Sequence, residues 1–373
     1  MIVLGEEYES IDIDSLTQHM VVLGQTGSGK TGFLLSLTES LMNNEIPTIL
    51  VDIKGDMANI MLTKHHPDHA FYVSTPGSSL VDPVNVLGDM ARDPNVGASS
   101  ILKMIGEDPD PMRSSAHAFL ATAIYEIRLQ CTLRNLVHEV MRPSFDRVGA
   151  LSLSDAFPPA KRKALAVKLN TLLVSPEYKD WIQGEPLDFD CLEDQDQTNC
   201  WIYSVSHLVE EHQRQFAISL LLEELMAWAR SQGGSNKLKA VLVIDEVFGL
   251  LPPHPFNPPT KKPLMLLLKQ ARAFGIGVVL ATQNPVDVDY KALSNCGTWV
   301  VGKLSTDKDR KHVVSGIGQG MNMEGLEETL CALHKREFAL LNSQGVTKFG
   351  SRDTNCELVG PITINKLAEM VPE

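Results

Sequence analysis

A glycine-rich stretch of eight residues, Gly24-Gln25-Thr26-Gly27-Ser28-Gly29-Lys30-Thr31, places the tightest constraint on how this chain folds. It matches the pattern G-x-x-x-x-G-K-[ST]. It lies between the apolar run 20–23 and a segment, 32–42, whose apolar residues recur at helical spacing. Glycines let the backbone wrap around phosphate groups, and the start of a helix adds a positive end. The stretch therefore predicts a strand–loop–helix unit that binds a nucleotide.

Each position of this phosphate loop (residues 24–31) has a predicted task. The backbone N–H groups of the loop are expected to point at the phosphates. Lys30 is expected to bring a mobile cation to the β- and γ-phosphates, and the hydroxyl of Thr31 is expected to bind Mg²⁺. We therefore expect the cofactors to be ATP and Mg²⁺. The nucleotide-binding residues are expected to be Gly24, Gln25, Thr26, Gly27, Ser28, Gly29, Lys30, Thr31 and Gly32.

Apolar runs of strand length alternate with helical segments through most of the chain. This order is typical of an α/β fold in which helices cover a mostly parallel sheet. The runs predict strands at residues 20–23, 48–52, 70–73, 200–204, 240–244, 277–281, 298–302 and 338–341.

Between the third and fourth of these strands the character of the sequence changes. Apolar residues at helical spacing take over in residues 116–129 and 161–173. We expect four parts along the chain. An amino-terminal part of the core at 1–96 is followed by a helical insertion at 97–197, a carboxy-terminal part of the core at 198–345 and an extension at 346–373.

The most apolar predicted strand ends in two carboxylates, Asp245 and Glu246. Asp245 is expected to hold Mg²⁺, and Glu246 is expected to polarise the attacking water as a general base. An ordinary strand that ends in solvated acidic residues is the alternative. Because the chain also carries a phosphate loop, the pattern favours a site for hydrolysis.

A later segment, 269–283, predicts a helix, a glycine turn, a strand and a polar tip at Gln283. Ligands bind at the carboxyl ends of the strands in open α/β sheets, and Gln283 would lie at such an end. We expect Gln283 to hydrogen-bond the γ-phosphate or the attacking water. A loop glutamine without a task is the alternative.

Four segments together resemble the HerA–FtsK superfamily of RecA-like, ring-forming motor ATPases, and most closely its HerA-like branch. They are GQTGSGKT at 24–31, VDIKGD at 51–56, VLVIDE at 241–246 and KQARAFGIGVVLATQNPVDVDYKALSNCGT at 269–298. The resemblance implies a RecA-like P-loop NTPase with an inserted helical subdomain. It also implies a homo-oligomeric ring, most often a hexamer, with Gln283 as the polar sensor.

The resemblance also assigns a role to Arg272, which matches an arginine that reaches the nucleotide of the next subunit. A cation supplied in trans stabilises transition-state charge. The alternative is that Arg272 caps the end of a helix, where cations are favoured. Arg310 and Arg336 are further candidates for a trans arginine. Asp52, Lys54 and Asp56 contact either the γ-phosphate region or a neighbouring subunit, or they are solvated loop charges.

One departure concerns the amino-terminal side. The archaeal members of the family carry a β-barrel before the phosphate loop, and the 23 residues that precede Gly24 here are too few to hold one. The resemblance therefore leaves open whether such a barrel has been cut away or is missing.

Composition limits the function further. The 33 basic and 46 acidic residues give a net charge of −13, which excludes a uniformly basic nucleic-acid-binding protein but allows a local basic lining. The clusters at 161–163 and 308–311 are candidates for contact with DNA phosphates, and a solvated face is the alternative for each. No apolar run approaches the roughly 18–20 residues of a membrane helix, and the six cysteines lack C-x-x-C spacing. We expect a soluble, cytoplasmic protein with reduced thiols and no membrane contact.

These observations predict a ring motor of HerA type that hydrolyses ATP and translocates on, or remodels, double-stranded DNA. A partner nuclease or an antiviral complex is compatible with this function. Two alternatives remain open. One is an ATP-switched oligomeric scaffold that organises a partner effector, and the other is a coupling ATPase of the secretion or conjugation type.

Overall fold

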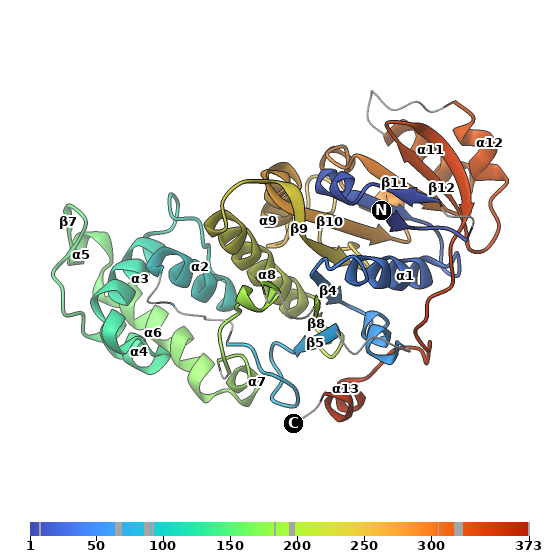
Figure 1. Cartoon of the computed structure of the whole chain (residues 1–373). Helices are drawn as coiled ribbons and strands as arrows, with labels where there is room; N and C mark the ends of the chain where they lie inside the picture. Colours follow the sequence, from blue (N-terminus) through green and yellow to red (C-terminus); the bar gives the residue numbers. More distant parts are fainter. Residues whose placement is uncertain are drawn as a thin grey trace. The chain divides into compact units, whose positions relative to one another are not determined.

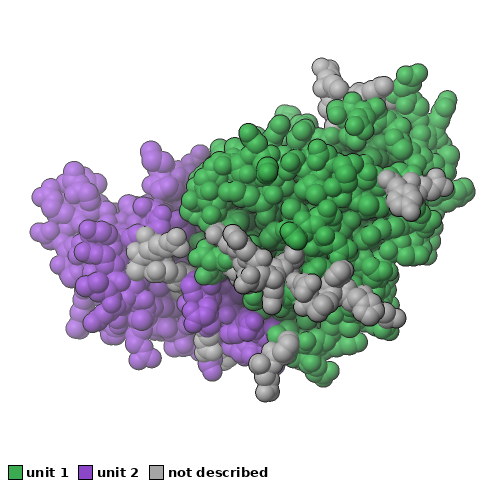
Figure 2. Space-filling view, in the orientation of Figure 1, with its two compact units in different colours: residues 1–74, 188–373 green, residues 75–187 purple. Residues whose placement is uncertain are grey.

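The computed structural model describes residues 1–6, 9–63, 69–85, 90, 93–182, 184–193, 198–304, 306–316 and 324–371. Two compact units make up the structure, and each has its own core. Unit 1 comprises residues 1–74 and 188–373, and unit 2 comprises residues 75–187 (Figure 2).

Unit 1 is built on a nine-stranded sheet with the order β13-β12-β11-β3-β10-β9-β4-β8-β5. Neighbouring strands from β11 to β5 run parallel, whereas β12 and β13 add an antiparallel hairpin at one edge. The predicted α/β fold with a mostly parallel sheet is thus confirmed. The strands are β3 (Met20–Leu23), β4 (Thr48–Asp52), β5 (His69–Ser74), β8 (Thr198–Ser204), β9 (Ser235–Ile244), β10 (Phe274–Thr282), β11 (Thr298–Gly302), β12 (Glu337–Asn342) and β13 (Gly345–Gly350).

Helices cover both faces of this sheet because the chain reverses its direction of travel along it (Figure 1). It moves one way from β3 to β4 and the other way from β8 through β9 to β10. Crossovers between parallel strands are right-handed, so the helices of the two runs lie on opposite faces. Accordingly, α1 (Lys30–Met42) packs on β4, whereas α8 (Glu211–Ser231) packs on α9 (Lys261–Gln270) and on β10.

Shorter elements complete unit 1. They are β1 (Ile2–Val3), β2 (Ser10–Ile11), η1 (Ile13–Gln18), η2 (Met57–Leu62), η4 (Asp190–Glu193), η5 (Ala271–Ala273), η6 (Pro285–Asp287), α10 (Tyr290–Leu293), α11 (Asp307–Gly316), α12 (Leu326–Cys331) and α13 (Ile364–Met370). No helix in the part of the chain that the structure describes is long and apolar enough to span a membrane.

The strand order decides where the polar residues meet. The register pairs Leu23 of β3 with Thr282 of β10, and Ile244 of β9 with Val51 of β4. The residues that follow these four strands therefore all leave the sheet at the edge formed by the carboxyl ends of the parallel strands. In this way the phosphate loop, Gln283, the acidic pair at 245–246 and Asp52 come together, with β10 lying between β3 and β9.

A carboxy-terminal strap, residues 351–363, returns from the edge hairpin across unit 1 to α13 (Figure 1). The carboxylate of Glu39, a buried residue of α1, accepts hydrogen bonds from this strap. The donors are the Thr354 hydroxyl at 2.8 Å and the Asn355 N–H at 2.8 Å. Further along, the Ile362 N–H donates to the Gly55 carbonyl at 2.9 Å. The strap thereby connects the helix of the phosphate loop to the turn that follows β4.

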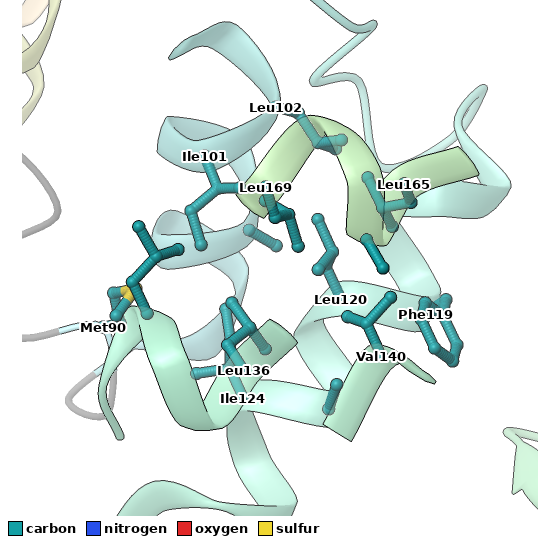
Figure 3. Packing of buried hydrophobic residues seen from close by; sticks show 14 of the residues in the cluster. Met90, Ile101, Leu102, Phe119, Leu120, Ile124, Leu136, Val140, Leu165 and Leu169 are labelled. Carbon is teal, nitrogen blue, oxygen red and sulfur yellow. The ribbon is translucent and has the colours of Figure 1, made fainter. Parts of the chain in front are cut away.

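Unit 2 is helical and buries a core of its own. Side chains of α2, α3, α4 and α6 converge on one apolar cluster, and Figure 3 shows Leu120, Leu136 and Leu169 pointing into it. The elements of unit 2 are α2 (Pro94–Met104), α3 (Ser115–Glu126), η3 (Arg128–Gln130), α4 (Leu133–Met141), β6 (Arg147–Val148), β7 (Leu151–Ser152), α5 (Leu153–Ala156), α6 (Pro159–Val174) and α7 (Pro176–Lys179).

The boundaries differ from the predicted domain limits at both ends of the insertion. Unit 2 begins at residue 75 instead of 97, because the segment before α2 folds with it. Val84 and Glu185 form a bridge there, and Gly77 packs on Trp181. Unit 2 ends at residue 187 instead of 197. The predicted extension at 346–373 also begins inside the sheet, since it contains most of β13.

Candidate nucleotide-binding site

The phosphate loop has the backbone geometry that a phosphate-binding turn needs. Gly27 and Gly29 have φ values of 76° and 103°, a left-handed conformation that favours glycine. The N–H groups of Gly27, Gly29, Lys30 and Thr31 donate to no other described protein group. They lie at the amino end of α1, where free N–H groups and the helix dipole attract anions.

The Lys30 side chain is mostly buried and lies within the loop itself. Its ammonium donates to the Gly24 carbonyl at 2.5 Å and to the Gln25 carbonyl at 3.2 Å. Burial lowers the pKa of Lys30 to about 8. The carboxylate of Glu246 opposes this shift, and the charge of Lys54 adds to it. A triphosphate would satisfy this desolvated cation, because a phosphate oxygen is a stronger partner than a carbonyl.

The two predicted acidic residues follow β9 at the same edge. The carboxylate of Asp245 accepts from the Ile53 N–H at 3.4 Å. Burial, followed by the neighbouring charge of Asp52, raises the pKa of Asp245 well above its ordinary value. A divalent cation would offset both effects. The donor set of the Thr31 hydroxyl and the Asp245 carboxylate suits Mg²⁺, which prefers oxygen ligands.

Asp52 has a structural task at the end of β4. Its carboxylate is fully buried and accepts backbone N–H groups from Gly55 at 2.8 Å, Met57 at 3.3 Å and Ala58 at 3.0 Å. It therefore fixes the turn 52–58 instead of extending into solvent. Burial raises the pKa of Asp52 to about 6, although these three hydrogen bonds lower it.

Gln283 lies beside the phosphate loop. Its side-chain oxygen accepts from the Thr26 hydroxyl at 2.5 Å. The contact joins β10 to the loop directly, because β10 is the neighbour of β3 in the sheet. The structure thus brings the phosphate loop, Asp245, Glu246 and Gln283 together, as their positions at strand ends predicted. Gly32 lies in the first turn of α1, and a Cβ added there would meet no described atom within 4 Å.

Arg272 lies elsewhere. It is exposed in η5, just before β10, and therefore at the sheet edge opposite to the phosphate loop. The nine residues of β10 span about 30 Å, so Arg272 cannot reach the nucleotide site of its own chain. No hydrogen bond from its guanidinium caps α9 among the described residues. Its action in trans remains a prediction.

The other two arginines are engaged within the chain. Arg336 donates its backbone N–H to the Ser28 carbonyl at 2.8 Å, and its guanidinium lies 2.5 Å from the carboxylate of Asp353. Arg310 pairs with Asp307 and donates to the Leu304 carbonyl at 3.3 Å. Arg336 thus supports the phosphate loop of its own chain, a contact that the sequence analysis missed.

Lys54 is the second feature that sequence analysis left undecided. Its ammonium lies 2.9 Å from the carboxylate of Glu246. The two residues are 192 positions apart in the chain, so only the strand order brings them together. The segment VDIKGD was the available signal, because it ends a strand at the ligand-binding edge.

Comparison with known proteins agrees with this geometry. Residues 7–127, which include the phosphate loop, match the family model described as the central domain of helicase HerA. The resemblance to the HerA-like branch of the HerA–FtsK superfamily is confirmed.

Two curated relatives carry the same signal. A probable helicase of Methanocaldococcus jannaschii is 31% identical over 80 residues, which is 21% of this chain and 16% of that protein. The DNA import protein CedB of Sulfolobus acidocaldarius is 24% identical over 272 residues, which is 72% of this chain and 40% of that protein. The matched part thus spans less than half the length of either relative.

Solved structures show the same fold across nearly the whole chain. The plasmid coupling protein TrwB, in complex with ADP and Mg²⁺, superposes with a TM-score of 0.63 at 14% identity. The match covers 97% of this chain and 92% of that one. VirB4 of Thermoanaerobacter pseudethanolicus gives a TM-score of 0.63 at 12% identity, covering 94% and 96%. The fold is therefore the RecA-like α/β fold of these solved structures, as predicted.

Proposed function

We propose that this chain hydrolyses ATP and that copies of it, assembled as a ring, translocate on double-stranded DNA. The observation that carries the proposal is the order β3-β10-β9 at one sheet edge. With this order, a triphosphate would bind at Lys30, a metal would be held by Thr31 and Asp245, and Glu246 would serve as the base. The Thr26–Gln283 hydrogen bond joins the sensor strand to the same loop.

In this site the residues of the chain divide the work. Lys30 and the N–H groups of the loop bind the β- and γ-phosphates, and Mg²⁺ held by Thr31 and Asp245 would neutralise developing charge. Glu246 takes a proton from the attacking water, which adds to the γ-phosphorus as the bond to ADP breaks. Loss of the γ-phosphate would change the contacts of Gln283 and so displace β10.

Support for DNA as the track comes from the relatives. One is named a probable helicase and the other a DNA import protein. We propose that the ring is a hexamer that moves on DNA. We also propose that it acts in the cytoplasm and with a partner nuclease or effector.

The test measures ATP turnover of the purified chain with and without linear duplex DNA. We expect duplex DNA to raise turnover, and the stimulation to weaken with salt because phosphate contacts release counterions. Lys30→Ala should lower turnover about a hundredfold or more. Glu246→Gln should retain bound ATP and favour the ring. Lys366→Ala, at an exposed lysine of α13, is the control.

Two outcomes would contradict the proposal. Turnover that persists in Lys30→Ala would assign hydrolysis to another site or to a contaminant. Turnover that ignores duplex DNA, but rises with a partner protein, would favour the scaffold function instead.

A further inference from the structure

The proposed general base is bound at both of its oxygens. Glu246 Oε2 lies 2.9 Å from the Lys54 ammonium, and Oε1 accepts from the Phe248 N–H at 3.4 Å. The Glu246 side chain is only 11% exposed, so few other partners can reach it. A general base must have an oxygen within hydrogen-bond reach of the attacking water. Held in this way, each oxygen already has one donor, and the carboxylate is less free to turn toward the attacking water.

Lys54 sits on a turn that is fixed from two sides. From within the chain segment, the buried carboxylate of Asp52 accepts the N–H groups of Gly55, Met57 and Ala58. From outside, the carboxy-terminal strap supplies the Ile362 N–H to the Gly55 carbonyl at 2.9 Å. The backbone that carries Lys54 is therefore rigid, and the flexible part is its side chain.

The ion pair adds little to folding. Lys54 is 37% exposed, and pairs between partly exposed charges contribute little to stability because solvent screens them. The same weakness makes the pair easy to exchange. Lys54 is also close enough to Lys30 for its charge to help lower the pKa of Lys30, after the larger effect of burial. Negative charge bound at Lys30 would therefore compete with Glu246 for Lys54.

We propose that Lys54 is a positioning residue that holds Glu246 in an inactive orientation and releases it when a γ-phosphate attracts the ammonium. This inference rests on the proposed function, because it takes Glu246 as the base. It assigns a task to the segment VDIKGD, and it makes hydrolysis depend on the turn 52–58.

The experiment compares DNA-free ATP turnover in Lys54→Met and Lys54→Gln with that of the unchanged chain. Freed from the lysine, Glu246 populates its active orientation more often. We expect kcat to rise about fivefold, a change equivalent to about 1 kcal/mol, with KM altered less than twofold. Lys54→Arg keeps a cation on the same turn, so its kcat should stay close to that of the unchanged chain.

A matched control removes a comparable ion pair elsewhere. Lys348 of β13 lies 2.8 Å from Glu337, with side-chain exposures of 40% and 29%. Lys348→Met should leave kcat unchanged. Thermal unfolding of each variant checks that the fold is kept, and either neutral variant at position 54 that folds is sufficient.

The outcomes separate the two proposals. A lower or unchanged kcat in a neutral Lys54 variant that folds overturns the positioning role of Lys54, because the lysine would then bind phosphate or serve the fold alone. Two further variants test the base itself. One combines Lys54→Met with Glu246→Gln, and the other carries Glu246→Gln alone. If they retain turnover, the assignment of Glu246 under the proposed function fails instead.

Discussion

His19 is held in an environment that disfavours its charged form. It precedes β3, its residue surface is 1% exposed, and its backbone has a φ of 64° and a ψ of 158°. Its carbonyl accepts the Thr298 N–H at 3.2 Å, which ties this conformation to the start of β11. Burial lowers the pKa of His19 from 6.5 to about 4, and the charge of Arg272 adds to this. The imidazole is therefore neutral in the folded chain at neutral pH.

This shift predicts a dependence of stability on pH. Between pH 6.5 and pH 4 the unfolded chain takes up a proton at His19 and the folded chain does not. The free energy of unfolding therefore falls as the pH falls through this interval. His19 contributes a loss of about 3 kcal/mol. His19→Asn removes the titratable ring and keeps a polar side chain, so it is the variant to compare by urea unfolding at several pH values.

Other groups titrate in the same interval, and the raised pKa of Asp52 has the opposite effect on stability. The difference between the unchanged chain and His19→Asn isolates the histidine. Equal slopes of unfolding free energy against pH in the two proteins would show that His19 is not the cause.

At the scale of single residues, the sequence predicted the candidate site well where its residues are close together in the chain. The phosphate loop is contiguous, so its glycines and Lys30 form a recognisable motif within eight consecutive positions. The ion pair of Lys54 with Glu246 could not be predicted, because it depends on β4 and β9 being neighbours. The contact of Arg336 with the phosphate loop is hidden for the same reason, across 308 positions from Ser28.

At the scale of elements, the carboxy-terminal strap stands out because it depends on one buried carboxylate. Glu39 is 4% exposed and accepts from Thr354, Asn355 and the Cys356 thiol, the last at 3.1 Å. Arg352 lies 3.4 Å from its second oxygen. Hydrogen bonds to a charged group are stronger than neutral ones, so Glu39 anchors the strap on α1.

Glu39→Gln should loosen the strap, because an amide accepts these donors less strongly and adds a donor of its own. We expect the free energy of unfolding to decrease by about 2 kcal/mol. The thiol of Cys356 reports the change directly, because burial raises its pKa to about 12 while the strap is docked. Alkylation of Cys356 by a maleimide should accelerate several-fold, measured by peptide mass spectrometry.

Exposed Cys331 of α12 provides an internal reference, and its rate should stay the same. Glu45→Gln, at an exposed position just after α1, is the control variant. A strap that protects Cys356 equally in Glu39→Gln would mean that its backbone contacts suffice.

The elements themselves were predicted unevenly. Strands buried on both faces, such as β4, β9 and β11, consist of continuous apolar runs and were visible in the sequence. The edge strand β13 was not predicted, because its sequence GVTKFG lacks such a run. The strap has no periodic pattern at all, since side-chain and backbone hydrogen bonds hold it instead of an apolar face.

At the scale of the whole molecule, the proposed ring would make each nucleotide site depend on a neighbouring copy. Arg272 is at the opposite sheet edge from the phosphate loop, so any action of Arg272 on a nucleotide would require a neighbouring copy. In a head-to-tail ring every subunit offers one such edge to the next. This arrangement supports the trans role that the family resemblance implies.

Mixed rings test this role. Lys30→Ala and Arg272→Ala subunits should each be inactive alone, the first without a phosphate-binding lysine and the second without the trans cation. Equal mixing should place an intact site beside an intact arginine at roughly one site in four, and so restore some turnover. The measurement is ATP turnover against mixing ratio. Mixtures as inactive as their components would instead favour a local role for Arg272 beside α9.

The strand β10 begins at Phe274, two residues after Arg272, and ends at Thr282, one residue before Gln283. A single strand thus separates Gln283, the group proposed to sense one nucleotide, from Arg272, the group proposed to touch the next. Around a closed assembly these segments would form an unbroken relay. The order in which the sites hydrolyse ATP would then be set by the central sheet, because no flexible linker separates Gln283 from Arg272.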